Sequence, residues 1–336
     1  MIPVDDNEHE QMVHDATKVA NNNNINNSNS NNNSNSKHHH KEHMVLFVHG
    51  LYGAPTDFTN LSSQLKKKHP DINIQLSESN YFFGATRQGI DTCGDRLVSE
   101  ILKLTEEHKP KKISIVGHSL GGVIGRYAIG KLEEQNYFNE VKPVQFVSLS
   151  SPHCGSRRPP NGWLNRIISK YTDTFISTTG NQLMLTDDEK DPLLVRLANK
   201  HGSYHKALSR FENRTLYSNI ENDFQVVFNT SNISHRNPYT KGDFPMKFSE
   251  RYNHLIDPEQ MPQFEPLPVE KDPFANDEKG QQLKDILSNL QSLNFTRYHT
   301  HFPDRLAHTH IVQKREWVNQ VGADVVNHIV DNIVVD

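Results

Sequence analysis

The sequence predicts an α/β fold in which a mainly parallel sheet is flanked by helices. Short, continuous apolar runs alternate with longer amphipathic stretches from about residue 44 onward. Continuous apolar runs are typical of strands buried on both faces, and their alternation with helices predicts βαβ units. Residues 44–336 are numerous enough to enclose a continuous hydrophobic interior. We therefore expect a single folded domain over residues 44–336.

The first predicted strand is the apolar run Val45–Val48. A helix is expected over about residues 56–68, with Thr56 as its N-cap, and residues 72–76 alternate as a second strand. Residues 91–108 then carry apolar side chains at intervals of three or four. This spacing predicts an amphipathic helix that packs one face on the sheet.

The same pattern then repeats. Residues 113–116 predict a strand, residues 120–134 a helix, and residues 144–149 another strand. From about residue 156 to residue 211 the strand signals stop, and polar loops mix with helical pieces such as residues 192–200. We expect 156–211 to be an insertion that covers the sheet as a cap or lid.

The last third of the chain returns to the alternation of strands and helices. A strand begins at residues 215–217 and is expected to end near Asn222, and five prolines make residues 257–274 an irregular surface excursion. A helix over residues 281–293 and a strand over residues 294–298 follow. The chain closes on a helix with one apolar face, formed by Val325, Val326, Ile329, Val330 and Ile333.

The first 43 residues differ from this domain in composition. Residues 21–36 are Asn and Ser apart from Ile25. Such a tract cannot bury enough apolar surface to offset its chain entropy. The histidines at 38–40 and 43 lie beside this low-complexity sequence, which favours a polar tract over a metal site. We predict that residues 1–43 are disordered.

Charge and composition argue against several classes of function. The net charge of −4 and the isoelectric point of about 6.6 give no indication of a nucleic-acid partner. No stretch approaches the 18 apolar residues of a membrane span, and no secretory leader is evident. The two cysteines, Cys93 and Cys154, fit a reducing compartment. We expect a cytoplasmic protein that is not secreted, with peripheral contact to a membrane left open.

The strongest chemical signal is Gly117-His118-Ser119-Leu120-Gly121. One serine between two glycines is common by chance, but here a predicted strand ends directly before the motif and a helix begins directly after it. A serine in such a turn exposes its hydroxyl above the sheet, and the helix N-terminus favours a developing negative charge. We predict that Ser119 is the nucleophile of an α/β-hydrolase fold.

Acyl transfer through a serine needs two backbone N–H groups that stabilise the oxyanion. The residue after the nucleophile, Leu120, supplies one of them in this fold. The other comes from the loop after an earlier strand, and the glycine-containing residues 49–53 follow the first predicted strand. Leu51 is our candidate for the second donor. The alternative is a glycine turn without a catalytic part.

The serine also needs a histidine base and a carboxylate that orients it, in the chain order serine, acid, histidine. Asp223 follows a late predicted strand, where the acid is expected, and Glu221 and Asp243 are its rivals. The base is expected after the last strand, and spacing does not separate the candidates there. These are His299, His301, His308 and His310.

Several stretches, in the right order and over nearly all of the predicted domain, resemble the putative serine esterase family of eukaryotic lipase-like proteins. The resemblance lies in residues 46–58, residues 89–97, GHSLGGVIGRYAIGKL at 117–132, SPHCGSR at 151–157, LYSNIENDFQVVF at 216–228, AHTHI at 307–311 and GADVVNHIVDN at 322–332. The family pattern has its histidine directly after an alanine, which implies His308 as the base, and it implies Asp223 as the acid. The second histidine, His310, departs from this pattern.

The resemblance implies a lipase or esterase that acts on acylglycerols or phospholipids, in the cytosol or at a membrane or lipid-droplet surface. The implied reaction passes through an acyl-enzyme on Ser119 and requires no metal or organic cofactor. Two other classes of function remain open. The fold can serve as a binding module without turnover, and an acyltransferase or thioesterase would use the same serine.

Overall fold

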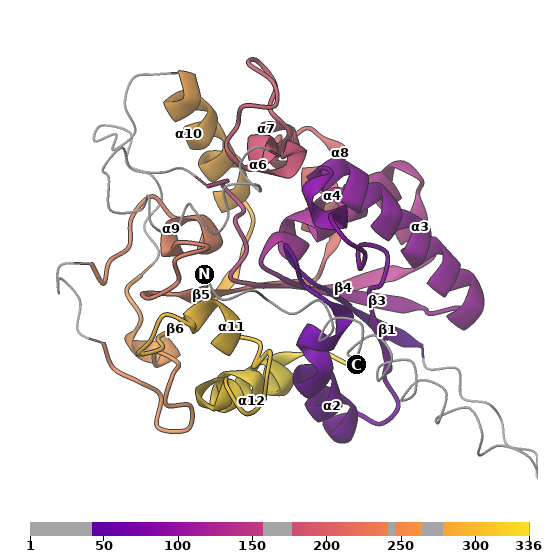
Figure 1. Ribbon diagram of the computed structural model, residues 1–336. Helices are drawn as coiled ribbons and strands as arrows, with labels where there is room; N and C mark the ends of the chain where they lie inside the picture. The colour runs from indigo at the N-terminus through magenta and orange to yellow at the C-terminus, as the bar shows by residue number, and fades with distance from the viewer. Residues whose placement is uncertain (1–41, 157–176, 241–245, 264–277, 336) are drawn as a thin grey trace, which may run out of the picture. The chain divides into compact units, whose positions relative to one another are not determined.

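The computed structural model of the protein describes residues 42–156, 177–240, 246–263 and 278–335. At its centre is a six-stranded sheet in the order β2-β1-β3-β4-β5-β6, in which every neighbouring pair is parallel (Figure 1). The strands are β1 (His43–Val48), β2 (Asn73–Leu76), β3 (Lys112–His118), β4 (Lys142–Leu149), β5 (Asn213–Asn219) and β6 (Thr296–Thr300). The predicted parallel sheet is confirmed.

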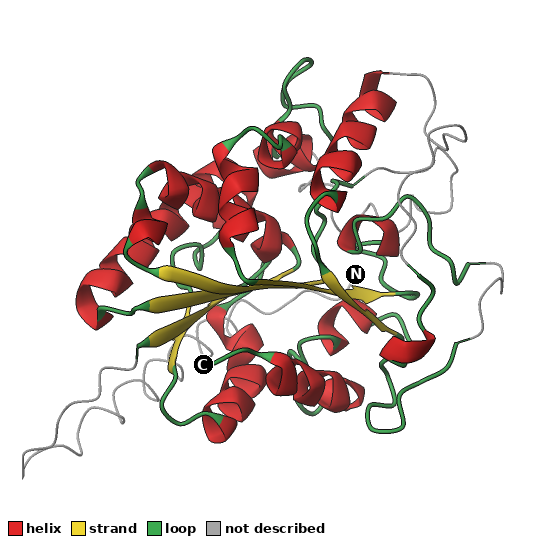
Figure 2. Cartoon of the chain, turned by 180° about the vertical axis from the view of Figure 1, so that it is seen from behind, coloured by secondary structure: helices red, strands yellow, loops and turns green. Residues whose placement is uncertain are grey.

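Helices cover both faces of the sheet (Figures 1 and 2). One face carries α3 (Ile90–His108), α4 (Leu120–Glu134), α7 (Leu193–Ala198), α8 (Ser203–Arg210) and α10 (Glu278–Gln291). The other face carries α2 (Thr59–Lys68), α11 (Ala307–His310) and α12 (Ala323–Asn332). Shorter elements are α6 (Thr178–Leu183), α9 (Phe228–Ser231) and the 3-10 helices η1 (Pro55–Phe58), η2 (Ala85–Arg87), η3 (Tyr137–Asn139), η5 (Pro258–Gln260) and η6 (Gln320–Gly322).

Strand β1 is apolar from Met44 to Val48 because both of its faces are covered. In β1, Met44 and Leu46 belong to the core beneath α3 and α4, whereas Val45 and Phe47 belong to the core above α2 and α12. All four side chains are fully buried. Burial of each one contributes roughly 1.5–3 kcal/mol to folding. This two-sided burial explains why the sequence shows a continuous apolar run and not an alternation.

Helix α4 begins and ends at the predicted residues, Leu120 and Glu134. It is buried on almost all sides because α3 and α8 pack against it and β3 lies beneath it. The helix ends where Asn136 adopts a left-handed conformation, with φ of 59°, a common way for a helix to terminate. The core therefore fixes the helix that follows Ser119.

The prediction of Thr56 as a helix N-cap is wrong. The chain enters the 3-10 helix η1 one residue earlier, at Pro55, and continues from there into α2. The carboxylate of Asp57 accepts a hydrogen bond from the N–H of Ala54 at 3.2 Å. A proline is favoured at the first helical position because its φ is already helical and it lacks an N–H group to satisfy. Proline chemistry thus decides where the helix starts.

The ends of the last two strands also differ from the prediction. Strand β5 ends at Asn219 and not near Asn222, and β6 covers residues 296–300 and not 294–298. The two strands pair so that Asn219 lies beside Thr300. Strand ends depend on this pairing between neighbours as well as on hydrophobicity, and a single sequence does not reveal the pairing.

Part of the predicted lid, residues 157–176, lies outside the described residues. This part includes residues 163–168, of which Trp163, Leu164, Ile167 and Ile168 are apolar. The described helices α7 and α8 pack against α4, and α7 also packs against α10. The lid remains a prediction, as does the disorder of the N-terminal region, of which only residues 42 and 43 are described. No helix in the described ranges is both long and apolar enough to cross a bilayer.

Candidate active site

Ser119 lies in a strained turn between β3 and α4, at the carboxyl edge of the sheet. Its backbone angles are φ 55° and ψ −130°, a combination that is rare for a residue with a Cβ atom. Its N–H donates to the carbonyl oxygen of Leu149, at the end of β4, over 2.9 Å. A strained strand-to-helix turn of this kind is the backbone geometry of a nucleophile elbow.

Two glycines allow the backbone to come close to itself around this turn. A Cβ atom on Gly121 would lie 2.0 Å from the carbonyl oxygen of Val48, at the end of β1. A Cβ atom on Gly50 would lie 2.6 Å from Cβ and 3.1 Å from Oγ of Ser119. Neither position has room for a larger residue. The contact at Gly50 brings the loop after β1 directly against Ser119.

The predicted oxyanion donors are the N–H groups of Leu51 and Leu120. Within the described residues, neither group donates a hydrogen bond to another protein group. Leu120 is the first residue of α4, where N–H groups have no intrahelical partner. Leu51 directly follows Gly50. Both donors are available to a ligand, and their role stays a prediction.

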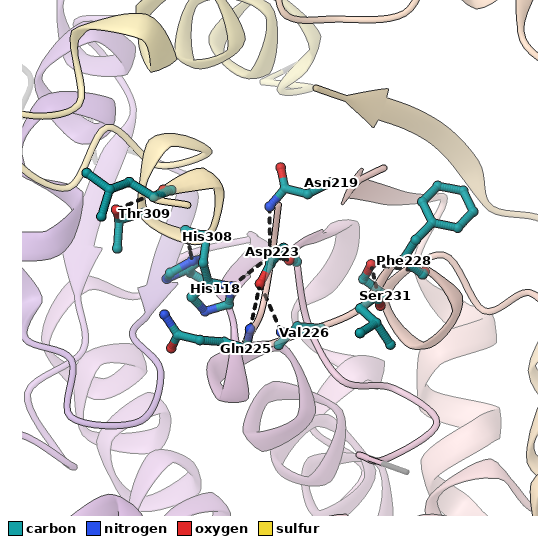
Figure 3. A network of polar contacts seen from close by, with 12 residues as sticks. His118, Asn219, Asp223, Gln225, Val226, Phe228, Ser231, His308 and Thr309 are labelled. Atoms are coloured by element: carbon teal, nitrogen blue, oxygen red, sulfur yellow. Dashed lines mark hydrogen bonds and ion pairs between the residues drawn. The ribbon is translucent and has the colours of Figure 1, made fainter. Parts of the chain in front are cut away.

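Asp223 and His308 are brought into contact from positions 85 residues apart (Figure 3). Nδ1 of His308 lies 2.9 Å from Oδ2 of Asp223, and the exposed fractions of the two side chains are 5% and 1%. An ionised carboxylate only accepts hydrogen bonds, so Nδ1 carries the proton. Nε2 is therefore the ring nitrogen that can accept a further proton.

The carboxylate of Asp223 is held by several further donors (Figure 3). Oδ2 also accepts from Oγ of Ser150 at 2.6 Å and from Nδ2 of Asn219 at 2.8 Å. Oδ1 accepts from the N–H groups of residues 225 and 226 at 3.1 and 2.9 Å. Burial alone would raise the pKa of Asp223, but the charge of His308 and these hydrogen bonds lower it to about 2. Asp223 is therefore ionised and fixed in orientation.

Ser150 and Asn219 were missed by the sequence analysis. Asn219 is the last residue of β5, and Ser150 directly follows β4. Asn219 is held in turn by the hydroxyl of Thr300 on β6, which donates to its Oδ1 over 2.7 Å. Polar residues at the carboxyl ends of neighbouring parallel strands are a signal that would have found them. Three adjacent strands thus orient the carboxylate of Asp223.

His118 connects the serine turn to His308. Its Nε2 donates to the carbonyl oxygen of His308 over 2.8 Å, and the two ring centroids are 4.8 Å apart. Burial, followed by the charge of His308, lowers the pKa of His118 well below its usual value, so the ring is neutral. Within the described residues no hydrogen bond joins Ser119 to His308. Contacts of this kind are often longer when no substrate is bound.

The rival candidates have other partners. Glu221 is partly exposed and lies 3.7 Å from His301, while Asp243 falls outside the described residues. The remaining histidine contacts are those of His299 with Tyr239 and Asn232, and of His310 with Asp304 and Asn319. Among the described candidates, the pair of Asp223 and His308 is distinguished by its short distance of 2.9 Å and by the burial of both side chains, whereas Glu221 and His301 are more exposed.

The strand order, the strained turn after β3 and the position of the Asp223 carboxylate after β5 place the protein in the α/β-hydrolase fold. The chain matches the family described as "Putative serine esterase (DUF676)" over residues 38–235. The chain belongs to this family, as the resemblance in its motifs indicated.

Two curated relatives are yeast proteins. Putative lipase ROG1 of Saccharomyces cerevisiae is 31% identical over 201 residues, which cover 57% of this chain and 29% of the relative. Putative lipase C4A8.10 of Schizosaccharomyces pombe is 29% identical over 206 residues, which cover 56% and 26%. The chain thus spans less than a third of the length of these relatives. Among solved structures, a lipase-esterase related protein from Clostridium acetobutylicum is similar with a TM-score of 0.42 and 14% identity, over 87% of this chain and 95% of that chain.

Proposed function

We propose that the protein hydrolyses carboxylic esters, with Ser119 as the nucleophile. The observation that carries the proposal is the buried contact between Asp223 and His308 next to the strained turn of Ser119. A serine hydroxyl becomes a nucleophile when a neighbouring base takes its proton and a carboxylate stabilises the charged base. Membership of a family described as serine esterases supports the same chemistry.

In the first half of the proposed reaction, Oγ of Ser119 attacks the carbonyl carbon of the ester while Nε2 of His308 takes its proton. Asp223 stabilises the imidazolium through Nδ1. The N–H groups of Leu51 and Leu120 stabilise the oxyanion of the tetrahedral intermediate. The bond to the alcohol oxygen then breaks, and His308 donates its proton to the departing alcohol. An acyl-enzyme on Ser119 remains.

In the second half, a water molecule attacks the acyl carbon and gives a proton to Nε2 of His308. The resulting oxyanion is again stabilised by the two backbone N–H groups, and the bond to Oγ breaks. His308 returns its proton to Ser119 as the acid leaves. Side chains and backbone supply each proton transfer and the oxyanion site, so we assign no metal or organic cofactor.

We propose lipid esters, acylglycerols or phospholipids, as the substrate class. The names of the relatives, which are called putative lipases, support this assignment. A thioesterase or an acyltransferase would share the first half of the reaction and differ in the leaving group or the acceptor. Activity must therefore be measured with esters, with thioesters, and with an alcohol present as an acceptor of the acyl group.

The nucleophile is tested with a fluorophosphonate probe, which reacts with activated serines. The wild type and Ser99→Ala are expected to be labelled and to hydrolyse esters, whereas Ser119→Ala should do neither. Ser99 is a suitable control because it is exposed on α3, away from the turn after β3. Absence of labelling in folded wild-type protein would reject the hydrolase and favour a binding module.

A further inference from the structure

The exposed large apolar side chains of the described residues share one position in the topology. All of them lie on connections that leave the carboxyl ends of strands, the edge of the sheet at which Ser119 lies. They are Tyr52 after β1, Tyr81, Phe82 and Phe83 after β2, Val227, Met246 and Phe248 after β5, and Leu306 and Trp317 after β6. In the described ranges, the connections that return to the amino ends carry none. Within this set, residues 81–83 are consecutive, and exposed apolar residues that adjoin one another mark an interaction surface.

The connection after β2 presents three consecutive aromatic residues, Tyr81, Phe82 and Phe83, which we call the aromatic tip. Phe83 is fully exposed, and the other two side chains are more than half exposed. Gly84 has a φ of 75°, and the N–H of Ala85 donates to the carbonyl oxygen of Phe82 over 3.1 Å. A hydrogen-bonded turn thus holds these apolar rings in water, where their exposure is unfavourable.

Guanidinium groups lie beside the exposed apolar side chains. Arg96 lies over the ring of Phe82 at 4.8 Å from its centroid. Arg305, next to Leu306 in sequence, lies 5.7 Å from the ring centroid of Phe224. No ion pair between described residues includes either arginine. Arg96 donates to the neutral side chains of Asn80 and Gln88, so no carboxylate among the described residues neutralises its charge. Such cations next to aromatic rings suit a layer of phosphate groups above acyl chains.

The aromatic tip is also connected to residues 49–53, the predicted oxyanion loop. The N–H of Tyr52 donates to Oγ1 of Thr86 over 3.2 Å. The ring of Tyr81 meets that of His49 edge-on, with centroids 6.4 Å apart. Tyr52 and His49 flank residues 50–51, and Gly50 lies against Ser119. A lipid surface that binds the aromatic tip would therefore lie close to Ser119.

We propose that the aromatic tip inserts into a phospholipid surface and thereby docks the Ser119 site on that surface. Side chains that protrude separately from several loops fit a fluid layer, whereas a folded partner requires a complementary face. The adjacent arginines match the phosphate groups in charge. Docking at a phospholipid surface serves catalysis only if the Ser119 site hydrolyses lipid esters, so this inference rests on the proposed function. Its test measures binding alone, so the two can fail independently.

The full chain carrying Ser119→Ala, which removes turnover, is sedimented with phosphatidylcholine vesicles, with and without a minor fraction of phosphatidylserine. In this background Phe82→Ser/Phe83→Ser is expected to lower vesicle binding about tenfold or more, since two aromatic rings no longer enter the acyl region. Glu78→Ser, a change at an exposed residue of the same connection, should leave binding to vesicles of phosphatidylcholine alone unchanged. Arg96→Gln should weaken binding mainly when phosphatidylserine is present.

Three outcomes would overturn the proposal. The first is failure of the Ser119→Ala protein to bind either vesicle, and the second is an equal loss of binding in Glu78→Ser. The third is formation of dimers that depend on Phe82 and Phe83 without vesicle binding, which would assign the aromatic tip to a second copy of the chain. Melting temperatures check folding, and Phe83→Ser alone repeats the test if the double variant is unstable, because Phe83 is fully exposed.

Discussion

His308 and His310 lie two residues apart on α11, are both buried, and each has a ring nitrogen 2.9 Å from a carboxylate oxygen. They differ in the rest of their surroundings. The partner of His308 is Asp223, which is buried and held by four further hydrogen bonds. Nε2 of His308 forms no hydrogen bond within the described residues. His308 therefore combines a fixed carboxylate with a nitrogen that is left for a proton.

His310 has both nitrogens engaged by the protein. Nδ1 accepts from Nδ2 of Asn319 over 2.9 Å, and Nε2 donates to Asp304, whose side chain is half exposed. A ring that is bonded at both ends fixes the chain and has no position for a substrate proton. The comparison teaches that a histidine–carboxylate pair alone does not identify a base. The second nitrogen has to be unoccupied as well.

The largest effect on activity is expected when each of the two histidines is replaced in a separate variant. His308→Gln should lower kcat/KM for an ester about 10⁴-fold, because it removes the proposed base, which is also the group proposed to protonate the alcohol. His310→Gln should retain most of the activity per folded molecule, since its nitrogens only bond the protein. Steady-state kinetics and melting temperatures of both variants measure this difference. Similar losses of kcat/KM in two folded variants would contradict the assignment.

The next largest effect concerns the carboxylates. Asp223→Asn should lower kcat about 10³-fold or more, because an amide does not stabilise the imidazolium and can favour the wrong tautomer of His308. Asp304→Asn is the matched control, because it changes the partner of His310 in the same way. Rates of both variants at saturating ester decide between them. A loss in Asp304→Asn as large as that in Asp223→Asn would reject the distinction between the two pairs.

The two carboxylates should also differ in acid. The pKa of Asp223 in the folded protein is about 2, below the value of about 3.9 for an unfolded chain. Its contribution, roughly 2–3 kcal/mol, is therefore present above about pH 4 and is lost as the pH falls toward 2. Urea unfolding of the wild type and Asp223→Asn should give a difference in unfolding free energy that shrinks over this range. A constant difference would show that the ionisation of Asp223 does not contribute.

The pKa of Asp304 is lowered too. Burial acts to raise this pKa, but the hydrogen bonds with Leu306 and His310 outweigh it. Because Asp304 is half exposed, its contribution to the unfolding free energy is smaller.

The smallest effect is expected at Ser150, a positioning residue whose hydroxyl donates to Asp223. Ser150→Ala should lower kcat about tenfold and leave KM nearly unchanged, because one hydrogen bond to the carboxylate is lost. Ser148→Ala is a matched control, since this buried hydroxyl contacts His153 and not Asp223. A purely structural role for Ser150 would lower the melting temperature and leave kcat unaltered.

The sequence by itself determined the alternation of strands and helices, the bounds of α4, and the turn that carries Ser119. These features depend on residues that are neighbours along the chain. Hydrophobic periodicity indicates which face of a single helix or strand is buried. Glycines around a serine indicate the backbone conformation of a tight turn. The choice of Thr56 as an N-cap failed at this same local level, because the effect of Pro55 was not considered.

Tertiary structure alone decided which side chains meet. The register of β5 with β6 brings Thr300 beside Asn219, and the pairing of β4 with β5 brings Ser150 to Asp223. The packing of α11 against the serine turn gives His308 and His310 different surroundings. The carbonyl oxygen of His308 contacts His118, whereas the ring of His310 contacts Asn319. Except for the contact of His310 with Asn319, these contacts join residues 73 to 190 positions apart. No local pattern encodes them, because they depend on how the whole sheet and its helices pack.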